Sequence, residues 1–374
     1  MRRKFYIVLA LLLAACFALA ACGGGIEQPA PVESEPAAVE PEPAAPEPEP
    51  AAPEPAGEVF EFNLQNHDAP TGATAMFLDA WAEEVNKASN GQIVIHCFHG
   101  GSMGGPGDSY NMVADGTVDI AWGLPSFTPG LFPNTDVIAL PFIGVKTSLQ
   151  ASYAIWELYD STDFLKEEWS NVHMILLHTN CDAPLITNTK VEKADDIRGM
   201  NMRVNGGPPT EWATLAGANP MNMGIGDVYS AMERGVVDGV TSTGWDVVSA
   251  FRFYEQGQYF LDYSIHVNPY FLVMNNDSYN SLPDDLKAVI DQYSGYGALE
   301  VVGTRWADVK ADVFDKIAES GGEIYKLDDA EQAIFNEYGV QAREKWMADT
   351  NDRGTDAEAL VAKAMELLDK HKDK

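Results

Sequence analysis

Beyond residue 58, short runs of apolar residues are separated by longer segments with helical spacing, and this order restricts the fold class more than any other feature. Residues 59–64, Val-Phe-Glu-Phe-Asn-Leu, alternate and predict a strand, and apolar residues at helical spacing predict a helix over 71–87. Strands that alternate with helices indicate the α/β class, with parallel sheets covered by helices on both faces. Further elements are predicted as a short helix at 108–115 and strands at 92–98, 118–122, 172–179, 200–204 and 236–240.

The last quarter of the chain changes character. Residues 286–374 have an almost entirely helical pattern. Ser281-Leu282-Pro283-Asp284 predicts a helix start there, because proline suits the first turn and acids suit the positive end of the helix dipole.

The N-terminus predicts export. Arg2, Arg3 and Lys4 precede an apolar segment at 5–15 that is too short for a good membrane span, which is typical of a secretory signal over residues 1–21. Leu19-Ala20-Ala21-Cys22 resembles a bacterial lipobox and predicts lipidation at Cys22. An earlier match ends at Cys16, and an ordinary signal peptide with a chance cysteine is the simpler alternative.

A tether is predicted over residues 22–57. Nine Glu and no Lys or Arg occur from Glu27 to Glu58, among many prolines, so this segment can bury no core and favours extended polyproline geometry. At ~3.1 Å per residue its reach is on the order of 100 Å. The expected location is extracytoplasmic, anchored by lipid to the cell membrane, in the periplasm or on the outer face of a Gram-positive membrane. The net charge of −32 argues against nucleic acid as a partner.

Two further cysteines lie in the predicted folded part. Cys97 and Cys181 are able to form a disulfide in an oxidising compartment. The alternative is a pair of buried thiols that act as small hydrophobic groups.

The middle of the chain carries a family resemblance. Residues 199–204, Gly-Met-Asn-Met-Arg-Val, resemble the Gly-Met-Lys-Ile-Arg-Val segment of TRAP-transporter solute-binding proteins of the C4-dicarboxylate-binding type. Residues 215–220 resemble the family's Leu-Gly-Ala-x-Pro turn, and residues 252–255 its Lys-Phe-Tyr-Glu. Residues 227–239, Asp-Val-Tyr-Ser-Ala-Met-Glu-Arg-Gly-Val-Val-Asp-Gly, resemble its longest signature. The resemblance extends over about residues 58–370.

This resemblance implies a two-lobed periplasmic-binding-protein fold, type II-like, with mixed sheets flanked by helices and long bracing helices at the C-terminus. It places lobe I at 58–181 and 266–305 and lobe II at 182–265 and 306–374. It further implies a receptor that closes on a small organic acid and delivers it to TRAP membrane permease subunits, without cofactor or metal. A C4-dicarboxylate binder and the ligand-binding component of a sensory system are the alternatives.

Arg203 is the residue expected to bind the ligand. On a strand over 200–204, Met200, Met202 and Val204 share one face, whereas Asn201 and Arg203 point the other way. A guanidinium is always charged and matches a carboxylate with two hydrogen bonds. Arg203 also matches the family's carboxylate-binding arginine.

The sequence departs from the family at two positions where other members carry a second arginine. Residues 180–187, Asn-Cys-Asp-Ala-Pro-Leu-Ile-Thr, contain none, and Leu131 stands where one branch has the arginine of Tyr-Thr-Pro-Gly-Arg-Phe-Pro. One cation leaves a second carboxylate poorly matched. The ligand is therefore expected to be a 2-oxo, 2-hydroxy or aromatic monocarboxylate.

Other candidate binding residues lie at predicted strand ends and loops. Trp122 ends a strand, and Trp245 follows a loop that lines the cleft in the family; either is placed to stack on a ligand or simply to pack. Ser242 or Thr243 matches a ligand-contacting asparagine of the family. The remaining candidates are Asn222, Met223, Asn66 and His67. Asp68, beside His67, is expected to cap the following helix.

An enzyme or a metal protein is disfavoured. His96, Cys97 and His99, with His67 and His178, form the best candidate metal set, but strand alternation places His96 on the opposite face from Cys97 and His99. The glycine-rich residues 99–107 lack the Gly-Lys-Ser/Thr of a phosphate loop, and no Gly-x-Ser-x-Gly occurs.

Overall fold

The computed structural model describes residues 57–180, 182–302 and 305–374, apart from the side chains of 302–309. These residues belong to one compact unit, Pro53–Lys374. The predicted signal, Cys22, nearly all of the predicted tether and Cys181 lie outside the described residues. Within them, no helix is both long and apolar enough to cross a membrane.

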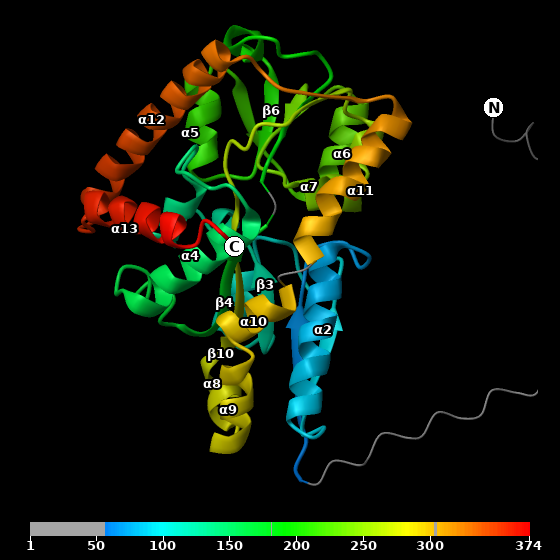
Figure 1. The fold of residues 1–374 in the computed structure, drawn as a ribbon. Helices are drawn as coiled ribbons and strands as arrows, with labels where there is room; N and C mark the ends of the chain where they lie inside the picture. Colours follow the sequence, from blue (N-terminus) through cyan, green and yellow to red (C-terminus); the bar gives the residue numbers. More distant parts are fainter. Residues whose placement is uncertain (1–56, 181, 303–304) are drawn as a thin grey trace, which may run out of the picture. The chain divides into compact units, whose positions relative to one another are not determined.

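The first sheet has five strands in the order β2-β1-β3-β10-β4 (Figure 1). β1 runs parallel to β2 and β3, whereas β10 runs antiparallel to both β3 and β4. The expectation of purely parallel strands is therefore wrong at β10, because the chain re-enters this sheet from the second one. The strands are β1 (Phe60–Gln65), β2 (Ile93–Phe98), β3 (Ile120–Gly123), β4 (Val172–Thr179) and β10 (Pro269–Asn275).

The second sheet has six strands in the order β11-β9-β5-β8-β6-β7. β6 runs parallel to β7 and β8, while β5 is antiparallel to both β8 and β9. The mixed sheets expected from the family resemblance are thus confirmed. The strands are β5 (Leu185–Thr187), β6 (Asn201–Val204), β7 (Asn219–Asn222), β8 (Gly239–Val240), β9 (Tyr259–Leu261) and β11 (Glu323–Tyr325).

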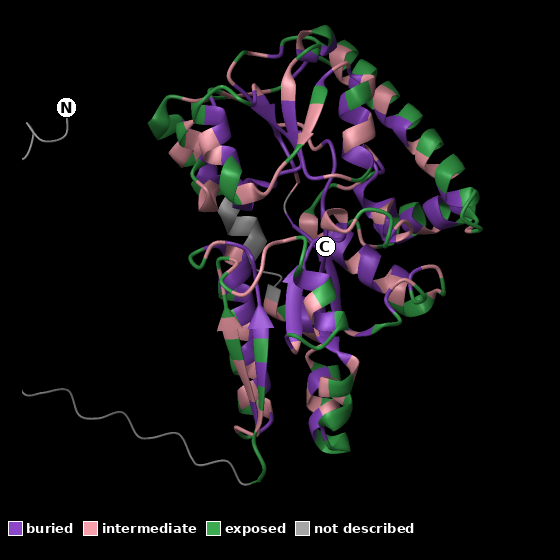
Figure 2. Cartoon of the chain, turned by 180° about the vertical axis from the view of Figure 1, so that it is seen from behind, coloured by how far each residue is buried: buried purple, intermediate pink, exposed green. Residues whose placement is uncertain are grey.

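Helices cover both sheets, and their apolar faces are buried. In α2, for example, Phe77, Leu78 and Val85 are fully buried, each contributing about 1.5–3 kcal/mol. Figure 2 shows the buried residues concentrated on the strands, with exposed residues on the outer faces of the helices. The α-helices are α2 (Ala73–Ala88), α3 (Ser109–Ala114), α4 (Ser148–Ser161), α5 (Pro208–Leu215), α6 (Ile225–Glu233), α7 (Trp245–Ala250), α8 (Asn276–Ser281), α9 (Asp284–Gln292), α10 (Tyr296–Val302), α11 (Arg305–Ser320), α12 (Asp329–Asn351) and α13 (Ala357–Lys370). Short 3-10 turns are η1 (Pro125–Phe127), η2 (Thr135–Ala139), η3 (Ala194–Ile197) and η4 (Phe253–Glu255).

The C-terminal helices connect the two lobes, as the resemblance implied. α12 packs against α5 beside the second sheet, and α13 packs against α4 beside the first (Figure 1). The Gln150 amide of α4 donates to the carbonyl oxygen of Leu368 in α13 at 2.8 Å. At ~1.5 Å per residue, the 23 residues of α12 span about 35 Å. The predicted lobe boundaries remain a proposal. The prediction assigned α13 to lobe II, within residues 306–374, whereas α13 packs against α4, which lies within the residues predicted as lobe I.

The chain crosses between the sheets through paired segments. It leaves the first sheet after β4 and returns to it at β10. Where these crossings meet, the Asn180 N–H donates to the Asn268 carbonyl at 3.4 Å, and the Asn268 N–H donates to Asn180 Oδ1 at 3.2 Å. Two buried asparagines therefore tie the crossing segments together.

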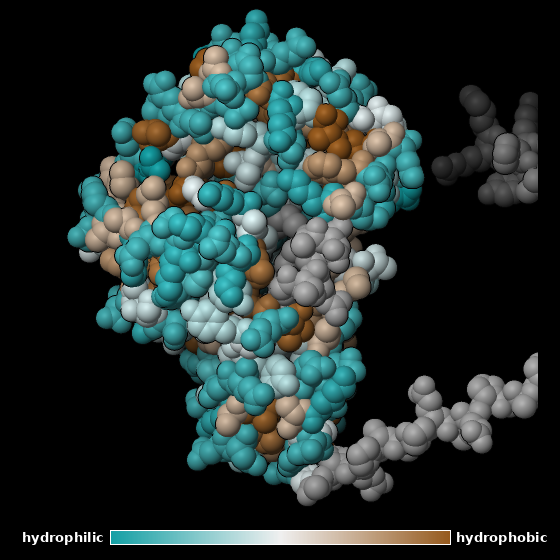
Figure 3. All heavy atoms as spheres, viewed as in Figure 1, coloured by the Kyte–Doolittle hydropathy of each residue, from teal (hydrophilic) through white to brown (hydrophobic). Residues whose placement is uncertain are grey.

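Two predicted elements differ from the structure. The strand predicted over 236–240 is only Gly239–Val240, because Gly235, at φ 65°, ends the preceding helix and the chain turns before it pairs. The last quarter of the chain is not entirely helical, since β11 adds an edge strand beside β9. Most of the face in Figure 3 is hydrophilic, with hydrophobic residues in small groups.

Candidate functional site

Arg203 lies on β6 with only 2% of its surface exposed. Its Nε and Nη2 donate to the Met223 carbonyl oxygen at 3.3 and 3.2 Å. Its Nη1 donates to the carbonyl oxygen of Ser242 at 3.2 Å and to Thr243 Oγ1 at 2.8 Å. These bonds fix the guanidinium in place and leave one N–H of Nη2 without a partner among the described residues.

The charge on Arg203 is not neutralised by a carboxylate in the described part of the chain, where its hydrogen-bond acceptors are carbonyl oxygens and a hydroxyl. Burial lowers the pKa of Arg203 to about 10, and the neighbouring Tyr270 acts in the opposite direction. A buried and uncompensated cation is costly, whereas an anion beside it is strongly favoured.

A small cavity of about 20 Å³ adjoins the Arg203 side chain. Both sheets contribute to its wall, which combines a few polar groups with apolar side chains, a composition typical of small-molecule sites. We call it the Arg203 cavity. Its lining residues are His67, Asp68, Leu124, Phe127, Arg203, Asn205, Ile225, Ser242, Thr243, Val247 and Tyr270.

The cavity lies where strands end. His67 and Leu124 follow β1 and β3 of the first sheet, and Asn205 and Ser242 follow β6 and β8 of the second. Ligands of open α/β sheets bind beyond the carboxyl ends of such strands.

Ser242 is held in a strained conformation at this edge. Its φ of 59° lies in the left-handed region, which costs a non-glycine residue about 1–3 kcal/mol. In this conformation its carbonyl oxygen accepts from Arg203, while its hydroxyl lies 3.1 Å from His266 Nε2. Burial lowers the pKa of His266 to about 4, so that histidine is neutral, and its Nδ1 lies 3.1 Å from the Val267 carbonyl oxygen. The strained residue thus positions acceptors for the guanidinium.

His67 and Asp68 form the polar part of the first-sheet wall. Burial lowers the pKa of His67 and raises that of Asp68. Asp68 Oδ2 accepts from the Thr74 hydroxyl at 3.0 Å, and its Oδ1 lies 3.8 Å from His67 Nε2. Asp68 is not the predicted helix cap: the N-cap of α2 is Gly72, without a side-chain cap.

Trp122 supports the cavity wall but is not part of it. Its ring stacks on Tyr270 with a centroid separation of 4.5 Å, and its Nε1–H donates to His178 Nε2 at 3.0 Å. Burial lowers the pKa of His178 to about 4, in keeping with its role as a neutral acceptor. Of the two roles predicted for Trp122, stacking on a ligand or packing in the core, its position favours packing.

The other predicted residues are only partly brought together. Arg203, Ser242, Thr243 and His67 meet in the cavity, and Met223 contributes its carbonyl oxygen to Arg203. Trp245 is fully buried and packs against Phe314. Asn66 forms a hydrogen bond with His99. Neither Trp245 nor Asn66 lines the cavity.

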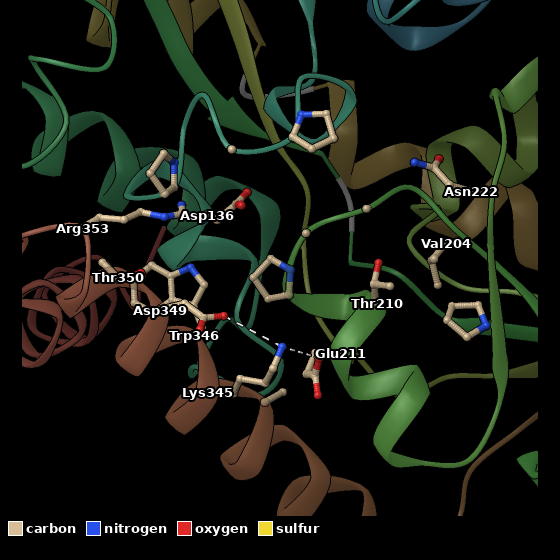
Figure 4. Close-up of a pocket in the computed structure, with 18 residues that line it drawn as sticks. Asp136, Val204, Thr210, Glu211, Asn222, Lys345, Trp346, Asp349, Thr350 and Arg353 are labelled. Carbon is tan, nitrogen blue, oxygen red and sulfur yellow. Dashed lines mark hydrogen bonds and ion pairs between the residues drawn. The ribbon is translucent and has the colours of Figure 1, made fainter.

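Asn222 lines a larger and more open hollow of about 440 Å³ (Figure 4). There Lys345 is paired with Glu211 at 2.9 Å and with Asp349 at 3.9 Å, and Arg353 points toward Asp136. Because these charges already face partners of the protein, this hollow makes a weaker case for an anion than the Arg203 cavity.

The candidate metal set is not gathered into one site. His96 lies 3.0 Å from Glu61, His178 bonds to Trp122, and His67 lines the cavity. Cys97, a free thiol whose pKa burial raises to about 12, does approach His99 and Asp79, with potential ligand atoms within 4.8 Å of one another.

The hydrogen bonds of His99 fit a structural role. Asn66 Oδ1 accepts from the Asp68 N–H, so Asn66 Nδ2 points to His99 Nδ1 at 3.1 Å. The ring proton of His99 then lies on Nε2 and is directed to Asp79 Oδ1 at 3.0 Å, which occupies the nitrogen that a metal would need.

Several cavity residues were not predicted from the sequence. Two of them could have been found from the sequence. Phe127 lies in the Phe-Thr-Pro-Gly segment that resembles the family. Asn205 follows Arg203 by two residues and so shares its strand face. Tyr270 and Val247 carried none, because only the return of the chain and the packing of α7 bring them to the site.

The chain matches a known protein family and is similar to curated proteins of that kind. The family model described as bacterial extracellular solute-binding protein, family 7, matches residues 66–349. Among curated proteins, the ectoine/5-hydroxyectoine-binding periplasmic protein UehA of Ruegeria pomeroyi is 23% identical over 77% of this chain and 85% of its own length.

Two solved structures are similar in sequence and fold. A marine metagenome TRAP solute-binding protein specific for aromatic acid ligands, in complex with 3-hydroxybenzoate, is 27% identical with a TM-score of 0.80, covering 85% of this chain and 100% of that one. A TRAP solute-binding protein from Rhodoferax ferrireducens T118 in complex with copurified benzoate is 25% identical with a TM-score of 0.80, covering 84% and 99%.

Proposed function

The chain belongs to family 7 of the bacterial extracellular solute-binding proteins, and we propose that it is a receptor for a small organic monocarboxylate held by Arg203. It is a two-lobed TRAP solute-binding protein and not an enzyme. Such proteins act outside the cytoplasm together with membrane permeases.

The observation that carries this proposal is the buried charge of Arg203. A ligand carboxylate supplies the counter-ion that the described residues do not. In a cavity that excludes water, the attraction between these charges is much stronger than in solution. The N–H of Nη2 that lacks a partner gives the carboxylate a first contact.

One carboxylate fits the cavity better than two. Among the described residues that line the cavity, Arg203 is the one permanently cationic side chain, and Asp68 presents a carboxyl group on the wall from the first sheet. A second ligand carboxylate would lack a cation and would meet Asp68. The relatives that bind 3-hydroxybenzoate and benzoate support the same ligand class. A C4-dicarboxylate is the alternative.

Binding of a panel of acids to the purified folded part, residues 57–374, tests this proposal. Calorimetry and thermal unfolding should detect benzoate-type, 2-oxo or 2-hydroxy monocarboxylates and no succinate, fumarate or malate. A ligand at 100 times its Kd raises the free energy of unfolding by about 2.7 kcal/mol.

Variants of Arg203 identify the binding group. Arg203→Met should weaken binding at least ~30-fold, the factor for about 2 kcal/mol, because it removes one partner of a buried charge pair. Arg203→Lys keeps the charge but loses the planar geometry, so it should retain part of the affinity. Arg198→Ala, at an exposed arginine, is the control and should bind normally. Dicarboxylates that bind more tightly than monocarboxylates, or unchanged binding by Arg203→Met, would refute the proposal.

We also propose that Cys22 carries a lipid anchor and that the receptor serves transport rather than sensing. The lipobox and the acidic, proline-rich residues that follow support the anchor. Detergent phase partitioning of the full-length protein tests it: the wild type should enter the detergent phase, and Cys22→Ser the aqueous phase. Deletion of the gene should abolish uptake of the ligand; normal uptake with a lost transcriptional response would favour sensing.

A further inference from the structure

Two acceptor atoms of the Arg203 cavity have no hydrogen-bond partner among the described residues. They are His67 Nδ1 and Asn205 Oδ1, both buried. Their residues come from opposite walls, one following β1 and the other following β6. Each unpaired buried polar atom costs about 1–3 kcal/mol, so such atoms are rare without a reason.

The orientation of the Asn205 amide is fixed by its neighbours. Asn268 Nδ2 donates to the Ser242 carbonyl oxygen at 3.4 Å, so Asn268 presents its oxygen to Asn205. Asn205 Nδ2 donates to that oxygen at 3.2 Å. The unpaired end of Asn205 is therefore an oxygen, which only accepts hydrogen bonds.

His67 supplies a second acceptor. Its pKa is lowered by burial, so the ring is neutral and carries one proton. Asp68 Oδ1 lies 3.8 Å from Nε2, too far for a hydrogen bond but close enough to favour the proton on that nitrogen. Nδ1 then presents a lone pair.

We infer that the ligand carries a hydroxyl group in addition to its carboxylate, and that its O–H donates to Asn205 Oδ1 or to His67 Nδ1. The inference rests on the proposed function, because Arg203 must hold the carboxylate. Because both atoms are acceptors, an O–H pairs with one of them, whereas a keto oxygen, a halogen or a bare ring pairs with neither. Of the monocarboxylates considered, this selects hydroxy acids over 2-oxo and unsubstituted acids.

Matched ligand pairs test this inference by calorimetry on residues 57–374. Mandelate and benzoylformate share a carbon skeleton and differ in hydroxyl against keto oxygen; 3-hydroxybenzoate and 3-fluorobenzoate are similar in size and differ in the donor. In at least one pair the hydroxylated acid should bind at least ~10-fold more tightly. A site that pairs a substrate hydroxyl discriminates strongly against analogues without it.

Two variants assign the discrimination to residues. Asn205→Leu and His67→Phe each remove one acceptor and keep a similar volume. At least one of them should reduce the ratio of affinities within the discriminating pair to about threefold or less, mainly by weakening the hydroxylated acid. A matched control is Asn219→Leu, an exposed amide on β7 outside the cavity, which should keep the wild-type ratio.

The outcomes separate this inference from the proposed function. If both members of each pair bind the wild type within threefold, or if both variants keep the wild-type ratio, the inference is wrong and the monocarboxylate receptor stands. If no monocarboxylate binds at all, the proposed function fails and the inference fails with it. Because each variant is judged by a ratio of two ligands on the same protein, a general loss of stability does not imitate the expected result.

Discussion

Nη1 of Arg203 donates to the hydroxyl of Thr243 at 2.8 Å, and its second N–H donates to the Ser242 carbonyl oxygen. A carboxylate that binds both Nη1 and Nη2 needs one N–H from each nitrogen. Both N–H groups of Nη1 are already paired, so such a carboxylate must displace the Thr243 hydroxyl or the Ser242 carbonyl oxygen.

Thr243→Val tests this competition. The variant leaves one N–H of Arg203 unpaired in the ligand-free protein, so its free energy of unfolding should fall by about 1–3 kcal/mol. Because the ligand carboxylate then fills the vacant position, its Kd should decrease, by up to ~10-fold. Urea unfolding and calorimetry measure the two effects, with the exposed Thr117→Val as control. A Kd that rises tenfold would mean instead that the Thr243 hydroxyl contacts the ligand.

Gly206→Ala should impair closure of the cavity. At φ 93°, an added Cβ would lie 2.9 Å from the Ser126 carbonyl oxygen, which belongs to η1 after the first sheet. The two walls must therefore separate, and ligand affinity should fall at least ~10-fold by calorimetry, the factor for about 1.4 kcal/mol.

Gly199→Ala is the matched control for Gly206→Ala. Gly199 has a φ of 77°, so alanine pays a similar backbone cost there, but nothing lies within 4 Å of the added Cβ. It should lose stability and keep its affinity. Equal affinities for the two variants would show that the contact with Ser126 does not limit closure.

Asp136→Asn should stabilise the protein more at pH 8 than at pH 5. Burial first, and then the nearby Glu168, raise the pKa of Asp136 from 3.8 to about 7 in the folded state. The folded protein thus binds a proton more tightly than the unfolded chain, so wild-type stability from this group falls as pH rises from about 4 through 7. Asparagine removes this loss.

The expected gain for Asp136→Asn is about 1–2 kcal/mol at pH 8, less than the pKa difference alone implies because the residue is only partly buried. Urea unfolding at both pH values measures it. Asp349→Asn, at an exposed acid on the same hollow, is the control substitution. A gain that is the same at pH 5 and pH 8 would exclude titration of Asp136 as the cause.

Trp122→Phe distinguishes support of the wall from contact with the ligand. Phenylalanine keeps the stacking on Tyr270 but removes the donor to His178 Nε2, at a cost of about 1–3 kcal/mol in stability. Ligand affinity should stay within threefold. Trp81→Phe, which loses a 2.8 Å bond to the Tyr293 carbonyl oxygen outside the cavity, gives the reference loss. A large loss of affinity without a loss of stability would place Trp122 on the ligand.

Local pattern predicted much of this protein. The strand at residues 172–179 has the bounds of β4, and the helix predicted over 71–87 is α2, because a continuous apolar run and a helical apolar stripe are properties of neighbouring residues. Two-residue alternation placed Arg203 on the face opposite Met202, and the family resemblance gave its candidate role. The positions of Ser242 and Thr243 came from the resemblance as well.

The tertiary structure decided what surrounds Arg203. Its acceptors lie 20 to 40 residues further along the chain, and the His67, Asp68 and Tyr270 side chains come from the other sheet. Trp122 lies near the end of a strand and Trp245 lies at the start of a helix, which are positions where ligand-stacking residues also occur. Packing nevertheless buries both side chains away from the cavity. Sequence spacing fixes which residues share one element. The unpaired atoms of Asn205 and His67 result from how two sheets and their crossing segments meet, and no local pattern contains that information.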